Sequence, residues 1–64
     1  MSVGAYEKAR EHLEKSLVIN KEIGDRNGEA TCYTNLGHVY ESVGEYEKAR
    51  EHFEKALVIS RDFL

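Results

Sequence analysis

Proline is absent from this chain, and cysteine occurs once, as Cys32. A single cysteine excludes a disulfide within the chain, and no group of residues is spaced like the ligands of a structural metal. One thiol and the lack of a signal-peptide pattern favour a reducing, intracellular environment, so we expect a cytoplasmic protein. Without proline, glycine is the only residue left that strongly interrupts regular structure.

The chain also has no cluster of like charges and no extended apolar segment. The formal net charge is −3, and acidic and basic residues are interspersed, so there is no basic stripe for nucleic acid and no cationic face for a membrane. No apolar run approaches the roughly 18 residues that a membrane span requires. In a chain of 64 residues, one core seldom supplies more than about 3 to 5 kcal/mol of net stability. We expect one small unit without nucleic-acid or membrane partners.

An internal repeat is the strongest feature that is present. Residues 2–20, SVGAYEKAREHLEKSLVIN, recur as residues 42–60, SVGEYEKAREHFEKALVIS, with four differences. The repeat distance is 40 residues, from Tyr6 to Tyr46. A period of this length is typical of helical solenoids.

The spacing of apolar residues predicts three helices, at residues 5–23, 28–42 and 45–63. Tight turns at Gly24 and Gly44 separate them, because glycine readily adopts the left-handed conformation that ends a helix. Asp25 can then accept hydrogen bonds from the first free amides of the second helix. The alternative is one long helix through Gly44, if that glycine has helical angles.

Each flanking helix has an inward face at helical spacing, opposite a charged face. We expect the inward residues of the first helix to be Tyr6, Ala9, Leu13, Ser16, Leu17 and Asn20. Those expected of the third are Tyr46, Ala49, Phe53, Ala56, Leu57 and Ser60, widened by Ile59 and Phe63.

The middle helix has an apolar arc of about half its circumference, wider than the roughly 100° that packing on a single neighbour requires. Its members are Ala30, Cys32, Tyr33, Leu36, Gly37, Val39, Tyr40 and Val43. We therefore expect this helix to touch a neighbour on each side. Gly37 costs about 1 kcal/mol of helix propensity relative to alanine, which indicates that a neighbouring helix approaches closely there.

The order of these residues resembles the tetratricopeptide repeat, in which two antiparallel helices, A and B, interlock and stack on the next pair. The residues that carry the resemblance are Tyr33, Leu36, Gly37, Tyr40, Gly44, Tyr46, Ala49, Phe53, Ala56 and Leu57. Tyr33 stands where tryptophan is common, and Arg61 stands where proline usually ends the helix. Together with the 40-residue period, this is similar to the long-repeat subtype of spindle-orientation adaptors, rapsyn-like scaffolds and kinesin light chains.

The resemblance implies an all-α solenoid fragment of about one and a half repeats over residues 1–64, with helices in the order B-A-B. Residues 5–23 would be helix B of a partial repeat. Residues 28–42 and 45–63 would be helix A and helix B of a complete one. The chain would begin inside a repeat, because residues 2–4 match residues 42–44.

The resemblance also implies a non-enzymatic scaffold that binds protein or peptide segments in a groove lined mainly by helix A. The positions that carry over are Thr31, Thr34, Asn35, His38, Glu41 and Ser42. The residues themselves indicate the same face, because it is polar yet carries one formal charge, whereas the flanking helices are crowded with Lys and Glu. The alternative is an ordinary solvated helix face.

Asn35 is the best single candidate for peptide contact, since a side-chain amide can donate to and accept from a peptide backbone at once. His38 either adds a hydrogen bond or a pH-sensitive contact, or is a plain surface histidine. We expect Cys32 to be a small buried hydrophobe and not a nucleophile. No motif for catalysis, a cofactor or phosphate binding is present, and we expect His12 and His52 not to share a metal.

A second hypothesis is structural. Solenoids usually need three or more repeats, because each repeat leaves an apolar face for its neighbour. Here Tyr6, Leu13 and Leu17 would be partly uncovered, and the chain ends in apolar Phe63 and Leu64. This predicts a homo-oligomer, formed by stacking of ends or by exchange of a helix around Gly24 or Gly44.

Overall fold

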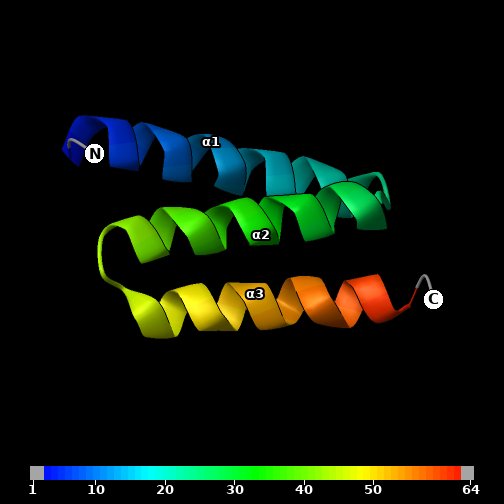
Figure 1. Ribbon diagram of the computed structural model, residues 1–64. Coiled ribbons are helices and arrows are strands. Elements are labelled where there is room, and N and C mark those ends of the chain that lie inside the picture. Colours follow the sequence, from blue (N-terminus) through cyan, green and yellow to red (C-terminus); the bar gives the residue numbers. More distant parts are fainter. Residues whose placement is uncertain (1–2, 63–64) are drawn as a thin grey trace.

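A computed structural model of the chain describes residues 3–62, which form three helices and no strand. The helices are α1 (Val3–Glu22), α2 (Arg26–Ser42) and α3 (Tyr46–Arg61). They lie side by side with α2 in the middle, and α2 runs antiparallel to both neighbours (Figure 1). The all-α prediction is confirmed. The expected inward Phe63 and the apolar end at Leu64 lie outside the described residues.

The two turns are built in the same way. Gly24 has φ +72° and Gly44 has φ +81°. The amide that follows each glycine donates to the carbonyl five residues earlier, at 2.8 Å in the first turn and 3.0 Å in the second. This is the longer hydrogen bond of a Schellman motif, which satisfies carbonyl groups that the end of a helix leaves free. A continuous helix through Gly44 is therefore wrong.

Asp25 sets the start of α2. Its Oδ1 accepts a hydrogen bond from the backbone amide of Gly28 at 2.9 Å, as expected of a cap. Gly28 also allows a close approach, because a Cβ there would lie 2.9 Å from Cγ of Asn20 in α1. The helix begins at Arg26, two residues before the range 28–42, since the cap residue directly precedes it.

The core is centred on α2. Five of its apolar residues are buried: Cys32, Tyr33, Leu36, Val39 and Tyr40. Leu36, only 1% exposed, packs in a cluster with residues from both neighbouring helices. The expected contact of α2 with a neighbour on each side is thus confirmed, although Val43 at the end of the arc is exposed.

Equivalent residues of α1 and α3 differ in burial, although the two helices have similar sequences. In α1, all six expected inward residues are half-buried. In α3, Ala49, Ala56 and Ile59 are buried, but Tyr46 is 68% exposed and Leu57 57% exposed. The expectation that Tyr46, Leu57 and Ser60 point inward is wrong. The reason is that α3 meets α2 through another part of its surface, and no described element covers the side that carries Tyr46 and Leu57.

Gly37 is the point of closest approach between α2 and α3. A Cβ placed there would lie 2.6 Å from Cε1 of Phe53 and within 2.9 Å of two further ring atoms. The same ring packs edge-on against His38, with centroids 5.1 Å apart. The phenyl ring therefore fills the space that a side chain at Gly37 would need.

We predict that Gly37→Ala lowers the free energy of unfolding by about 1 kcal/mol, because overpacking costs roughly 1 to 3 kcal/mol and outweighs about 1 kcal/mol of gained helix propensity. Urea unfolding followed by circular dichroism measures this. Gly4→Ala is the matched control, since nothing lies within 4 Å of a Cβ there. Phe53→Leu, which introduces the residue found at position 13, should relieve part of the loss. A Gly37→Ala variant more stable than the parent would contradict the proposed contact.

Candidate functional site

The six residues predicted to contact a peptide lie on one side of α2, which we call the outward face. Five of them are exposed and Thr34 is half-buried. The residues of this face are Thr31, Thr34, Asn35, His38, Glu41 and Ser42. The apolar arc occupies the other side of the helix, so α1 and α3 leave the outward face accessible.

Three hydroxyl groups of the outward face are engaged with their own helix. Thr31 Oγ1 donates to the carbonyl of Asn27 at 3.0 Å, and Thr34 Oγ1 to that of Ala30 at 3.1 Å. Ser42 Oγ donates to the carbonyl of Val39 at 2.6 Å. A hydroxyl that donates its proton to the helix keeps its lone pairs. These three positions therefore offer acceptors to a partner and no donor.

Asn35 differs from its neighbours on this face. Its side chain is exposed and makes no hydrogen bond to any residue in the described part of the chain. A free side-chain amide presents two N–H donors and one carbonyl acceptor. Within the outward face, Asn35 is thus the group best able to pair with both the N–H and the C=O of a peptide.

His38 and Glu41 form the end of the outward face nearest α3. Nδ1 of His38 lies 3.7 Å from Oε1 of Glu41, and the imidazole packs on the ring of Phe53. His38 is therefore fixed against α3, unlike an isolated surface histidine. It connects the polar face of α2 to an apolar surface on the next helix.

That apolar surface lines a hollow of about 360 Å³. Glu41 of α2 contributes to it, and the remaining lining residues come from α3: Tyr46, Ala49, Arg50, Phe53, Glu54 and Leu57. The α3 residues of this set that are exposed are Tyr46, Arg50, Glu54 and Leu57. Sequence reasoning assigned Tyr46 and Leu57 to the core, so it did not identify the hollow.

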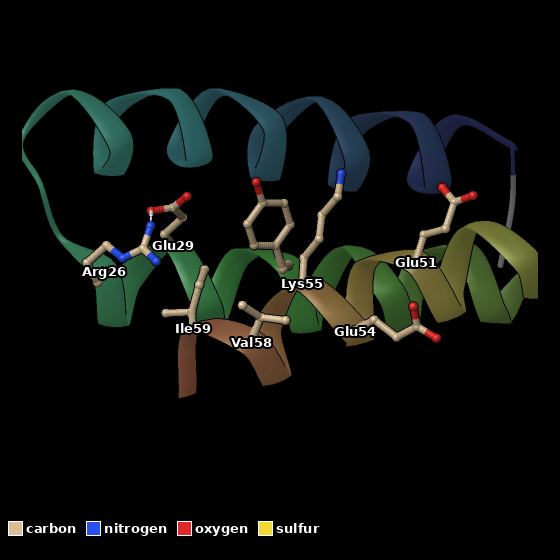
Figure 2. A pocket seen from close by; sticks show the side chains of 8 residues that line it. Arg26, Glu29, Glu51, Glu54, Lys55, Val58 and Ile59 are labelled. Atoms are coloured by element: carbon tan, nitrogen blue, oxygen red, sulfur yellow. Dashed lines mark hydrogen bonds and ion pairs between the residues drawn. The ribbon is translucent and has the colours of Figure 1, made fainter. Parts of the chain in front are cut away.

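A second hollow of about 560 Å³ lies between α2 and α3 on another side of the molecule (Figure 2). Arg26, Glu29 and Tyr33 of α2 line it with Glu51, Glu54, Lys55, Val58 and Ile59 of α3. Figure 2 shows Arg26 directed toward Glu29, and the two side chains are 3.3 Å apart. Arg26 also lies 3.3 Å from Asp62, so charges at this end of the hollow are already paired.

Tyr33 is flanked by two lysines. The ammonium groups of Lys21 and Lys55 lie 5.7 and 5.5 Å from the centre of its ring, within the range of cation–π attraction. The nearby phenol group of Tyr33 is the main reason that the pKa of Lys21 is raised above its ordinary value. Lysines from α1 and from α3 thus both contact one aromatic ring of α2.

Among residues 3–62, no three His, Cys, Asp or Glu side chains are close enough together to hold a metal ion. Cys32 is buried, as predicted, and its Sγ accepts a hydrogen bond from Nδ2 of Asn20 at 3.3 Å. Within residues 3–62, none of the three helices combines the length and the hydropathy that a membrane span requires.

The family model for the tetratricopeptide repeat matches residues 1–62. The chain belongs to the tetratricopeptide repeat family. Tetratricopeptide repeats generally mediate protein–protein interactions, which agrees with a surface that offers an amide, acceptors and apolar hollows. No curated protein and no solved structure matches the chain.

Within this tetratricopeptide repeat, Tyr33→Phe should lower the pKa of Lys21 toward its ordinary value, because the phenol hydroxyl is the main cause of the raised pKa. An NMR titration of the lysine side chains measures the change. Tyr46→Phe, which removes the hydroxyl of an exposed tyrosine, is the matched control and should leave the titration of Lys21 unaltered. An unchanged pKa of Lys21 in Tyr33→Phe would refute this role of the phenol group.

Proposed function

We propose that this chain is a non-enzymatic protein–protein interaction module whose outward face contributes one side of a peptide-binding groove. In this proposal α2 is helix A and α3 helix B of a complete repeat of the long, 40-residue subtype, and α1 is helix B of a partial one. The family match supports the general function. The free amide of Asn35 is the observation that supports this particular surface.

The chemistry of the outward face suits an extended peptide. Asn35 pairs with one peptide group, while the hydroxyl oxygens of Thr31 and Ser42 accept from neighbouring N–H groups. Glu41 is the only side chain of this face with a full negative charge, so it favours a basic residue at that end of the ligand. The imidazole of His38 and the ring beneath it, Phe53, provide an apolar edge for a side chain of the ligand.

The ligands for this test are peptides selected from a random library on the immobilised parent chain. We predict that their affinity falls roughly tenfold or more when Asn35 and His38 are both changed to alanine. The reason is that an unpaired polar group and a lost contact each cost about 1 kcal/mol or more. Fluorescence anisotropy measures the affinities. The control variant changes Lys8 and His12, two exposed residues of α1, to alanine. Equal affinities of the double variant and the parent chain would exclude this face as the groove.

Self-association is a second candidate function, supported by apolar surface on both outer helices. Ile19 and Ile23 of α1 are 56% and 69% exposed, and Tyr46 and Leu57 of α3 are open on the other side. In this candidate, copies of the chain associate through these ends and form a homo-oligomer. Such an assembly forms either by stacking of these ends or by exchange of a helix around Gly24 or Gly44, and only stacking buries the exposed apolar residues of the outer helices.

If this second candidate holds, light scattering at concentrations from micromolar to millimolar gives a mass that rises above the 7.3 kDa of one chain. Ile19→Asp should lower that rise, because a carboxylate placed in an apolar contact is costly to bury. Lys15→Gln, at an exposed position of the same helix, controls for the change in charge, because it also lowers the net charge by one unit. A constant mass of one chain over the whole range excludes self-association.

A further inference from the structure

Two lysines beside Tyr33 have no acidic partner. Lys21 of α1 and Lys55 of α3 approach the ring from helices on either side of α2, and neither forms an ion pair with a carboxylate in the described part of the chain. Four other basic side chains each lie within 3.8 Å of a carboxylate oxygen: Arg10, Arg26, Lys48 and Arg50. Two positive charges that meet at one ring are therefore left without a negative counterpart.

Glu51 is the residue best placed in the sequence to neutralise Lys55, because it stands four residues earlier on the same helix. Arg50 and Glu54 have the same spacing and do form a pair, at 3.3 Å. Lys55 instead lies over the ring of Tyr33. Figure 2 shows the side chains of Lys55 and Glu51 apart from each other and Glu54 directed away from Lys55. The ammonium of Lys55 therefore stays available to a partner.

The larger hollow, of about 560 Å³, adds a polar group and an apolar wall to these two charges. Tyr33 lines it, and a phenol can donate its O–H and accept another hydrogen bond at once. Val58 and Ile59 also line it, and Val58 is exposed. Lysine side chains are long and flexible, so the ammonium groups of Lys21 and Lys55 can both reach one anion placed beside the ring.

We propose that the larger hollow is a docking site for an extended peptide that carries an aspartate or glutamate next to an apolar residue. The carboxylate pairs with Lys21 and Lys55, and the apolar side chain lies against Val58. This proposal goes beyond the peptide groove, because Tyr33 belongs to the apolar arc of α2 and not to its outward face. It does not depend on the assignment of Asn35 or His38.

The surrounding charges favour a singly charged anion over a phosphate group. Glu29 and Glu51 line the same hollow as Tyr33, and Glu29 is one of the causes of the raised pKa of Lys21. These carboxylates reduce the net positive potential at the site. The cost of removing water from an ion grows with the square of its charge, whereas the attraction grows only in proportion to it. A carboxylate is therefore the better ligand.

The test titrates the ¹⁵N-labelled full chain with three unlabelled pentapeptides, which are acetylated, amidated and have alanine at both outer positions. Two leucines flank a central glutamate, glutamine or phosphoserine. We expect the glutamate peptide to shift the backbone amides of Tyr33, Lys55 and Val58 in a saturable way. Its affinity should exceed that of the glutamine peptide roughly fivefold or more, because only the carboxylate pairs with two ammonium groups. The phosphoserine peptide should bind more weakly than the glutamate peptide.

Lys21→Gln and Lys55→Gln should each lower the affinity for the glutamate peptide roughly 3- to 5-fold and leave that for the glutamine peptide unchanged. Both lysines are exposed, and circular dichroism verifies that the variants fold. Lys15→Gln is the matched control, because Lys15 is the exposed counterpart of Lys55 in α1, 40 positions earlier. It should have no effect. Glu51→Gln should raise the affinity about twofold, because it removes a nearby negative charge.

Asn35→Ala with His38→Ala should bind the glutamate peptide as the parent chain does, which separates this site from the peptide groove. Three results would overturn the proposal. The first is no binding, or equal affinities for the glutamate and glutamine peptides. The second is tightest binding of the phosphoserine peptide, which would make this a site for phosphate groups. The third is a loss in Lys15→Gln as large as in Lys55→Gln, or a set of shifts confined to the outward face of α2.

Discussion

The structure depends on the burial of α2 from two sides. Leu36 is almost fully inaccessible, and its cluster includes Tyr6, Leu13 and Leu17 from α1 as well as Ala49 and Phe53 from α3. Apolar burial contributes about 25 cal/mol per Å², and a chain of this length has few other sources of stability. Because one helix supplies most of the buried side chains, neither α1 nor α3 could be lost without exposing part of the same core.

Glycine makes this arrangement possible at two kinds of position. Gly24 and Gly44 reverse the chain with positive φ angles, which places three helices of similar length in one layer. Gly37 has an ordinary helical conformation but lets the ring of Phe53 lie directly on the backbone of α2. The same ring orients His38, so the close approach that stabilises the core also fixes one end of the outward face.

Helix positions, both turns and the inward face of α1 could be predicted from the sequence, because they follow from local periodicity and from the conformational freedom of glycine. The inward face of α3 could not. Periodicity identifies which side of a helix is apolar, but it does not say how many neighbours are present to cover it. Tyr46 and Leu57 follow the same pattern as Tyr6 and Leu17, but no described helix covers them and they are exposed.

The candidate site, too, could be predicted from the sequence only in part. The sequence predicts a polar face on α2, and the structure leaves that face accessible. Which polar groups are free depends on hydrogen bonds within the helix. The sequence therefore does not show that the hydroxyl of Thr34 is bonded to the helix while the amide of Asn35 is free. The ring of Tyr33 has lysines from two other helices near it, and no local pattern brings Lys21 and Lys55 together.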